Sequence, residues 1–310
     1  MLEAPPHPES IVRAASGRVV PLKVHQCLWS GDSLPNSLAA IQDCYRAPVA
    51  RAEIDIAALR DQDFLVVHDV DLADSTTGQG LVEDTTCAQA QHLRLTRNGV
   101  PTSVRPPLLS EVVPVIAAEA YPTLLELDLK DWKPWRWHRV EELARLVQPV
   151  KDRVIFGGGA DWNLRRLQHV DPSVAVGFTF TDYLDWVPLD AEADALPGVR
   201  GAYGYLDAHP LARQRLGPTT DYLRDRLGGI LRLVPGAREI HVRLEALEHM
   251  LDDGLSDLAD LLHAQRMLLD VWTLNAGTPH WSARLGRALA AGADVITTDT
   301  PRELAHAAAS

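Results

Sequence analysis

The stretch Thr123-Leu-Leu-Glu-Leu-Asp-Leu-Lys130 alternates apolar and charged side chains in the way that a half-buried β-strand does. Side chains two residues apart on a strand point to the same face, so Asp128 and Lys130 lie on one side. The strand predicted before it along the chain places Glu53 and Asp55 together in the same way. Charges this deep in a strand are costly unless they are paired or bind a metal. One such pair is typical of a solvated strand edge, but two on consecutive strands indicate a functional site.

Around these runs, short β-like segments alternate with amphipathic helix-like segments. This alternation is typical of a parallel sheet. Eight units without a sign of sheet reversal favour a closed (β/α)8 TIM barrel over an open doubly wound sheet. The predicted strands are residues 19–25, 52–56, 123–130, 153–157, 174–180, 239–244, 267–274 and 294–298. The predicted helices are residues 37–46, 110–120, 139–148, 163–169, 255–265 and 281–291.

Two connections in this barrel are long: residues 57–121 follow the second strand and residues 181–237 follow the fifth. Long loops in a compact barrel are commonly lids or partner surfaces. The second loop carries Trp186, Tyr203 and Tyr205. Residues 1–18, rich in Pro and Ala, are expected to form a loose lead-in, and residues 19–310 a single TIM-barrel domain.

The 310 residues are 46% hydrophobic and 23% charged, which is a globular composition. The formal net charge of −12 argues against a general binder of nucleic acid or anionic membrane, because such proteins are usually basic. No apolar stretch approaches the roughly 18 residues that a membrane span needs, and the first residues lack the pattern of a signal peptide. Cys27, Cys44 and Cys87 lack CxxC spacing and predict reduced thiols in a cytoplasmic protein. The oligomeric state stays open.

The strand ends carry the candidate chemistry, because the active site of a barrel lies at the carboxyl ends of its strands. Three hard carboxylates, Glu53, Asp55 and Asp128, suit Mg²⁺ or Ca²⁺, with Mn²⁺ as a further option, better than zinc. His25 and His68 are candidates for the general base and the general acid. His241 also lies on a predicted strand, but we do not assign it to the site.

The ordered motifs resemble the glycerophosphodiester phosphodiesterase family, metal-dependent TIM-barrel enzymes related to sphingomyelinase D and to phosphoinositide phospholipase C-like enzymes. The resemblance covers about residues 20–305. The matching segments are LPNSLAAI at 34–41, EID at 53–55, LVVHD at 65–69, STTGQG at 75–80, PLLSEV at 107–112, VWTLN at 271–275 and ADVITTDTP at 293–301.

This resemblance implies hydrolysis of a glycerophosphodiester or similar small phosphodiester, with a divalent cation on Glu53, Asp55 and Asp128. It implies that Lys130 contacts the phosphate and that His25 and His68 are the acid/base pair. Gln26, Trp272 and Asn275 are expected near the substrate pocket. Asp128 stands where the family usually has a metal-binding glutamate, and an aspartate there is closer to the related sphingomyelinase D enzymes. A cyclic phosphate intermediate and direct attack by water both stay open.

Three departures from the family pattern affect charged positions. The family's His-Arg-Gly is His25-Gln26-Cys27 here, its glutamate before Asn36 is Pro35, and the arginine before its Thr-Thr pair is Ser75. Asp32 is either a replacement for the missing acid or a plain turn residue. The departures favour retained chemistry with altered recognition. The alternatives are a repurposed enzyme (a sphingomyelinase D-like cleavage, or a lyase or transferase acting on a specialised phosphorylated metabolite) and a catalytically silent binding protein.

The scarcity of lysine draws attention to Lys23. It shares a face with His25, so it should point into the barrel one layer below the site, where an aliphatic residue is usual. Glu126 lies one layer below Asp128 in the same way. We therefore expect Lys23 and Glu126 to form a buried ion pair. In the alternative, the first strand has another register and Lys23 faces outward.

Overall fold

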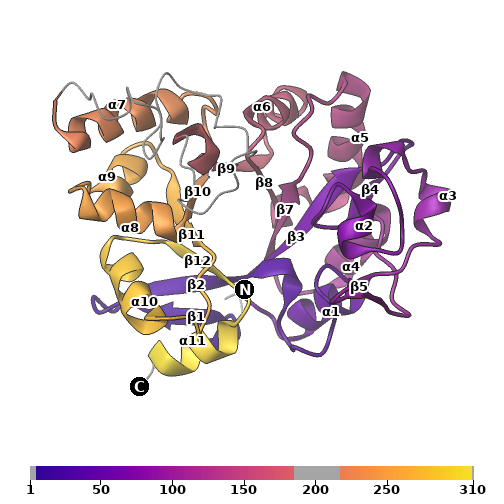
Figure 1. Cartoon of the computed structure of the whole chain (residues 1–310), viewed down its shortest axis with the longest axis horizontal. Helices are drawn as coiled ribbons and strands as arrows, with labels where there is room; N and C mark the ends of the chain where they lie inside the picture. Colours follow the sequence, from indigo (N-terminus) through magenta and orange to yellow (C-terminus); the bar gives the residue numbers. More distant parts are fainter. Residues whose placement is uncertain (1–4, 185–216, 309–310) are drawn as a thin grey trace.

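Eight parallel strands form a closed barrel in the computed structural model, which describes residues 5–184 and 217–308 (Figure 1). Strand β12 pairs with β2, and β2 pairs with β3, which closes the ring. All eight predicted strands are present, and the predicted TIM barrel is confirmed. The barrel strands are β2 (Val19–Val24), β3 (Arg51–Ala58), β7 (Leu124–Leu129), β8 (Val154–Gly158), β9 (Ala175–Thr179), β10 (Glu239–Arg243), β11 (Leu268–Trp272) and β12 (Val295–Thr298).

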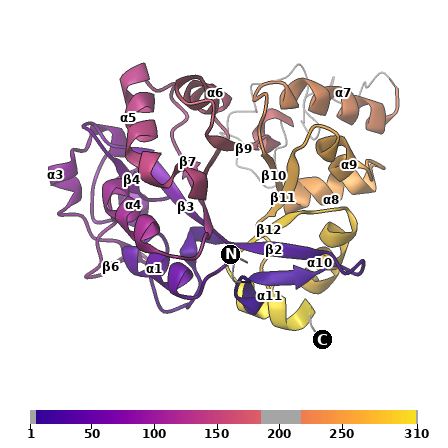
Figure 2. The ribbon, with the colours of Figure 1, turned by 180° about the vertical axis from the view of Figure 1, so that it is seen from behind.

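Helices surround the ring (Figures 1 and 2). The six predicted ones correspond to α1 (Leu38–Arg46), α4 (Leu109–Ala118), α5 (Trp137–Val147), α6 (Asp161–Val170), α9 (Leu258–His263) and α10 (Trp281–Ala290). Five others in the described residues were not predicted: the short α2 and α3, described below, and the longer α7 (Thr219–Leu231), α8 (Leu244–Asp252) and α11 (Pro301–Ala308). No helix within the described residues is long and apolar enough to cross a membrane.

Strand register brings the two acidic runs together. On the paired strands β3 and β7, Glu53 lies opposite Glu126, and Asp55 lies opposite Asp128. The alternate residues, such as Ile54 and Leu127, are fully buried in the hydrophobic core between strands and helices. Because apolar side chains cover the outer face of each strand, the charged set is directed into the barrel.

The long connection after β3 is a folded excursion with a small core of its own, which includes Leu65 and Leu72. It contains β4 (Phe64–Val66), which pairs antiparallel with β3, then α2 (Leu72–Ser75), η3 (Val82–Asp84), α3 (Cys87–Ala90) and the hairpin of β5 (Thr96–Arg97) and β6 (Val100–Pro101). Most of the second long connection, with Trp186, Tyr203 and Tyr205, lies outside the described residues.

The expected loose lead-in is wrong over residues 8–13. There η1 (Pro8–Ser10) leads into β1 (Ile11–Arg13), which pairs antiparallel with β2. Val12 is buried, and the Ser10 hydroxyl accepts a hydrogen bond of 3.0 Å from the Ala50 amide. These contacts attach the segment to the barrel, because β1 pairs with residues 19–21 of β2, ahead of the residues that pair with β12 and β3.

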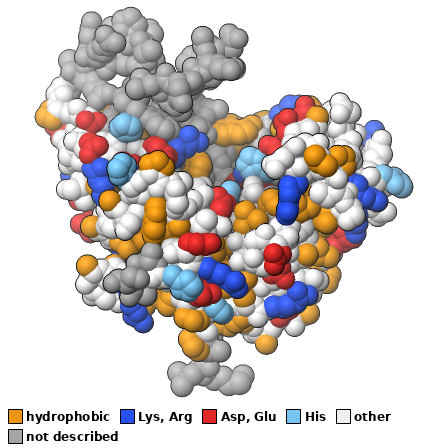
Figure 3. Space-filling view, turned by 60° about the horizontal axis from the view of Figure 1, so that its bottom comes forward, with side chains coloured by type: hydrophobic (Ala, Val, Ile, Leu, Met, Phe, Trp, Pro, Cys, Tyr) orange, Lys and Arg blue, Asp and Glu red, His pale blue; other side chains and the backbone are white. Residues whose placement is uncertain are grey.

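The surface carries mixed charge. On the face shown in Figure 3, acidic and basic side chains are interspersed, without a large patch of one sign. The three cysteines are free thiols, as predicted.

Candidate active site

A cavity of about 320 Å³ opens at the carboxyl ends of the barrel strands. It brings together six of the predicted site residues: His25, Glu53, His68, Asp128, Lys130 and Trp272. Its other lining residues include Trp132, Thr179 and Arg243 near the mouth and Lys23, Glu126, His241, Asp270 and Thr297 on the floor. Six of the predicted residues therefore lie around one continuous cavity.

The three predicted metal ligands converge within the cavity wall. Oxygen atoms of Glu53, Asp55 and Asp128 all lie within 4.8 Å of one another. Glu53 Oε1 is buried and has no hydrogen-bond partner. Burial, followed by the neighbouring charge of Asp55, raises the pKa of Glu53 well above its usual range. A bound cation would give this oxygen a partner and would reduce the repulsion between the carboxylates.

Lys130 neutralises part of this cluster. Its Nζ lies 2.7 Å from Asp55 Oδ1 and 2.6 Å from Asp128 Oδ2. Burial opposes ionisation of Asp55, but the charges of Lys130 and His68 and the hydrogen bonds from Lys130 and Asn36 together lower the pKa of that carboxyl. Three carboxylates and one ammonium leave a formal charge of −2. Oxygen ligands with this charge fit a divalent cation such as Mg²⁺ or Ca²⁺.

Two amide side chains support the carboxylates. Gln26 donates from its backbone N to Glu53 Oε2 at 2.8 Å and from Nε2 to Asp55 Oδ2 at 3.0 Å. Asn36 donates from Nδ2 to the same Asp55 oxygen at 2.7 Å. Both residues have a positive φ, 49° for Gln26 and 58° for Asn36, a backbone conformation that few non-glycine residues adopt. In this structure Gln26 therefore holds two of the carboxylates in position by hydrogen bonds.

His25 is oriented by a residue that the sequence analysis missed, Asp299. His25 Nδ1 lies 2.7 Å from Asp299 Oδ1, and its Nε2 lies 3.8 Å from Glu53 Oε2. Burial alone would lower the pKa of His25, but the hydrogen bond with Asp299 and the charge of Glu53 raise it to about 9. The quoted segment at 293–301 contains Asp299, directly after β12, but its contact with His25 spans 274 residues.

His68 lines the same cavity from the excursion after β3. Its side chain is 50% exposed, and its Nδ1 lies 2.9 Å from Asp69 Oδ1. Each predicted acid/base histidine thus has a carboxylate beside Nδ1, which fixes the ring and leaves Nε2 as the nitrogen suited to proton transfer.

Two residues expected near the substrate pocket, Gln26 and Asn275, do not line this cavity. Asn275 Nδ2 donates to Asp299 Oδ2 at 2.5 Å, so it supports the partner of His25. Asp32 is exposed and lines neither this cavity nor the neighbouring one, so it does not replace the missing acid.

The three departures from the family pattern meet in one place. Gln26, Pro35 and Ser75 all line a second cavity of about 200 Å³, together with His68 and Asp69. The Ser75 hydroxyl is buried there without a hydrogen-bond partner. The three departures, which are far apart in sequence, therefore alter the lining of one cavity beside His68.

The predicted ion pair of Lys23 and Glu126 is confirmed, and it belongs to a larger buried network. Lys23 is buried, and its Nζ contacts Glu126 and Asp270 and lies 3.8 Å from Glu239 Oε2. The outward-facing alternative for Lys23 is excluded. Arg51 contacts the other oxygen of Glu239.

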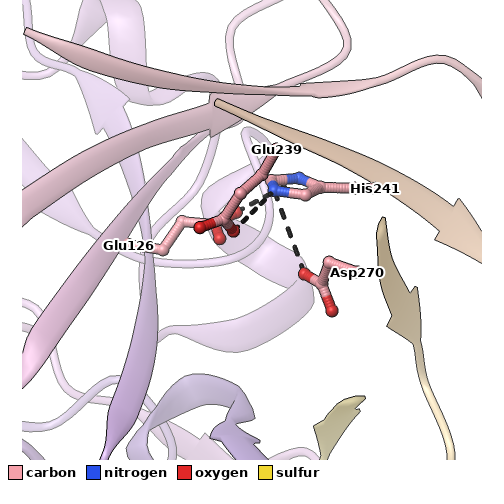
Figure 4. A group of neighbouring side chains, drawn as sticks. All are labelled: Glu126, Glu239, His241 and Asp270. Carbon is pink, nitrogen blue, oxygen red and sulfur yellow. Dashed lines mark ion pairs between the residues drawn. The ribbon is translucent and has the colours of Figure 1, made fainter. Parts of the chain in front are cut away.

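His241 completes the network, with Nδ1 3.4 Å from Glu126 Oε1 and Nε2 3.9 Å from Asp270 Oδ2 (Figure 4). Two glycines leave space for the side chains of this network. A Cβ at Gly157 would lie 2.1 Å from Glu126 Oε1, and one at Gly177 would lie 2.4 Å from His241 Nε2. The floor has acidic and imidazole groups that could hold a metal, but the Lys23 ammonium already serves as its cation.

Comparison with known proteins agrees with this geometry. A search of curated proteins found no match. Among solved structures, a phosphodiesterase from Oleispira antarctica in complex with the product sn-glycerol-3-phosphate is 19% identical, with 94% of this chain and 98% of that chain covered and a TM-score of 0.59. A glycerophosphoryl diester phosphodiesterase from Parabacteroides distasonis is 20% identical, with 99% and 93% covered and a TM-score of 0.58. These likenesses support the barrel fold.

The family model for the glycerophosphoryl diester phosphodiesterase family matches residues 29–303. This range contains the metal-site carboxylates, His68, Lys130 and Asp299. The match covers most of the 310 residues. The chain therefore belongs to the glycerophosphoryl diester phosphodiesterase family and is a phosphoric diester hydrolase.

Proposed function

We propose that the protein hydrolyses a glycerophosphodiester or a similar small phosphodiester in a metal-dependent reaction with His25 and His68 as acid/base pair. One observation carries the proposal: two carboxylate-oriented histidines, an acidic cluster and Lys130 line a single cavity. The Oleispira relative holds sn-glycerol-3-phosphate as its product, which supports a substrate of this size.

Each residue has a role that follows from its surroundings. Glu53, Asp55 and Asp128 would hold a divalent cation, which when bound supplies positive charge for the phosphoryl oxygens. Lys130 adds a positive charge beside the same place. One imidazole accepts the proton of the attacking hydroxyl, and the other donates a proton to the leaving alkoxide. Asp299 and Asp69 keep the two rings in position.

A second candidate is a repurposed enzyme with the same site, such as one with sphingomyelinase D-like cleavage. It is supported by the cluster of Gln26, Pro35 and Ser75 around one cavity and by an aspartate at position 128. The complete set of histidines, carboxylates and Lys130 argues against a silent binding protein.

The test is turnover of glycerophosphocholine and related diesters with Mg²⁺, Mn²⁺ or Ca²⁺, for the wild type and for His25→Ala and His68→Ala. Loss of one acid/base group should lower kcat by about 10²–10⁴-fold. His92→Ala is the matched control, because His92 is exposed and outside the cavity. Tight metal binding without turnover of any glycerophosphodiester would instead favour the repurposed enzyme.

A further inference from the structure

The second cavity, of about 200 Å³, adjoins the main one, because His68 lines both. The proposed mechanism places the phosphoryl group and the acid/base pair in the main cavity and leaves the second cavity without a role. An alcohol whose oxygen exchanges a proton with His68 would lie where the two cavities meet. The carbon skeleton of that alcohol would then extend into the second cavity.

The walls of the second cavity are largely uncharged. Leu34, Val67 and Leu95 are buried apolar side chains in its lining. The other lining residues are Gln26, Pro35, Asn36, His68, Asp69, Ser75 and Thr96. The cavity is smaller than the roughly 300–1,000 Å³ of sites for drug-sized ligands. It therefore suits a small alcohol and not an acyl chain.

The ionisable groups of the second cavity balance each other. Its lining residues, all in the described part of the chain, include no lysine or arginine, and the ionisable ones are His68 and Asp69. Asp69 Oδ1 lies 2.9 Å from His68 Nδ1, so the carboxylate balances a proton on the imidazole. A charged substituent of either sign would lose its hydration here without an unpaired counter-charge, which is unfavourable. A carboxylate would in addition meet Asp69.

The remaining polar groups of the lining are neutral. The amides of Gln26 and Asn36 each donate to Asp55 Oδ2, at 3.0 and 2.7 Å, so they are oriented by the metal site behind the wall. Ser75 is the last residue of α2, and its buried Oγ has no hydrogen-bond partner in the described structure. Because a buried hydroxyl without a partner is unfavourable, a hydroxyl group of the ligand would be favoured beside it.

We propose that the second cavity binds the alcohol that exchanges its proton with His68 and selects an uncharged one that carries a hydroxyl group. Ser75 is then a specificity-determining residue, because its side chain is short, neutral and part of the lining. This inference rests on the proposed function and names the substrate class: diesters in which the alcohol beside His68 is small and uncharged.

Three diesters of methanol test the selection. One is glyceryl methyl phosphate, and in the other two a carboxylate or an aminomethyl group replaces the terminal hydroxymethyl group. All three keep the hydroxyl next to the carbon that bears the phosphate. With Mg²⁺, the kcat/KM of the wild type should be at least about tenfold higher for the glyceryl diester than for either charged analogue, since a charged group without a partner costs this much.

Variants that add a cation to the second cavity should change this preference. Ser75→Arg should raise kcat/KM for the carboxylate analogue about tenfold or more, without raising it for the glyceryl diester. Thr96→Lys adds a cation from another part of the lining and should act in the same direction, so it decides the question if Ser75→Arg does not fold. Ser103→Arg is the matched control and should keep the preference of the wild type, because Ser103 is exposed and lines neither cavity.

Equal use of the glyceryl diester and either charged analogue by the wild type would overturn the proposal. Folded Ser75→Arg and Thr96→Lys variants that keep the wild-type preference would overturn it as well. Calorimetric binding of the three diesters to His25→Ala with Mg²⁺ separates these results from failure of the proposed function. If the wild type cleaves none of the three, a tighter affinity for the glyceryl diester still supports the inference, and equal affinities refute it.

Discussion

Replacement of Lys23 by methionine should destabilise the protein strongly, because Lys23 is the central cation of the buried floor network. Its side chain is 2% exposed and contacts Glu126 and Asp270. The third carboxylate, Glu239, lies 3.8 Å away, and at an effective dielectric constant of about 20 this pair alone contributes about 4 kcal/mol. Loss of one partner from a buried ion pair costs about 3–5 kcal/mol. For a chain of this length, that corresponds to a Tm lower by about 5–8 °C.

The stability lost in Lys23→Met should increase with pH. Burial already raises the pKa of Glu126, and removal of Lys23 raises it further. A carboxyl whose folded pKa exceeds its unfolded pKa destabilises the fold increasingly as pH rises through the folded value, and costs little below the unfolded value. The difference in Tm between wild type and Lys23→Met should therefore be larger at pH 8 than at pH 5. Thermal melts followed by circular dichroism measure it.

A double variant isolates the cause. Lys23→Met with Glu126→Gln removes one charge of each sign, so it should recover much of the stability lost in Lys23→Met alone. If the double variant is less stable than the single one, or if Lys23→Met costs less than about 1 kcal/mol, the reasoning from uncompensated charge is refuted.

Two further predictions concern the structure around the site. Asn36→Ala removes a hydrogen bond to Asp55 and should weaken binding of Mg²⁺ by about 10–100-fold, as such supporting partners do; calorimetry measures this, and an unchanged affinity would refute the assignment. Gly177→Ala places a Cβ against His241 and should cost about 1–3 kcal/mol by overpacking. Gly286→Ala in α10, where a Cβ meets no atom within 4 Å, should instead stabilise by about 0.5–1 kcal/mol; thermal melts of both variants decide.

The strands and their inward faces were predictable because the two-residue period of a strand is rigid. That period, applied to Lys23 and Glu126, was enough to predict a buried contact between residues 103 positions apart. The partner of His25 was not predictable in this way, because Asp299 follows its strand and no period directs its side chain. The fold of the first long connection was not predictable either, because its packing depends on contacts between many short elements.

The charges inside the barrel are the feature that most needs a physical reason, since aliphatic layers are usual there. In the floor, Glu126, Glu239 and Asp270 face Lys23 and Arg51, which leaves one excess negative charge. Burial alone would lower the pKa of His241, but the charge of Glu126, the hydrogen bond with Glu239 and the charge of Asp270 together raise it. The floor therefore favours a proton on His241, which would bring its formal charge to zero. The metal-site cluster above carries −2, which a divalent cation would cancel. With that proton the floor would add no net charge beneath the cluster, so the cluster itself would attract the cation and Lys130 the phosphodiester.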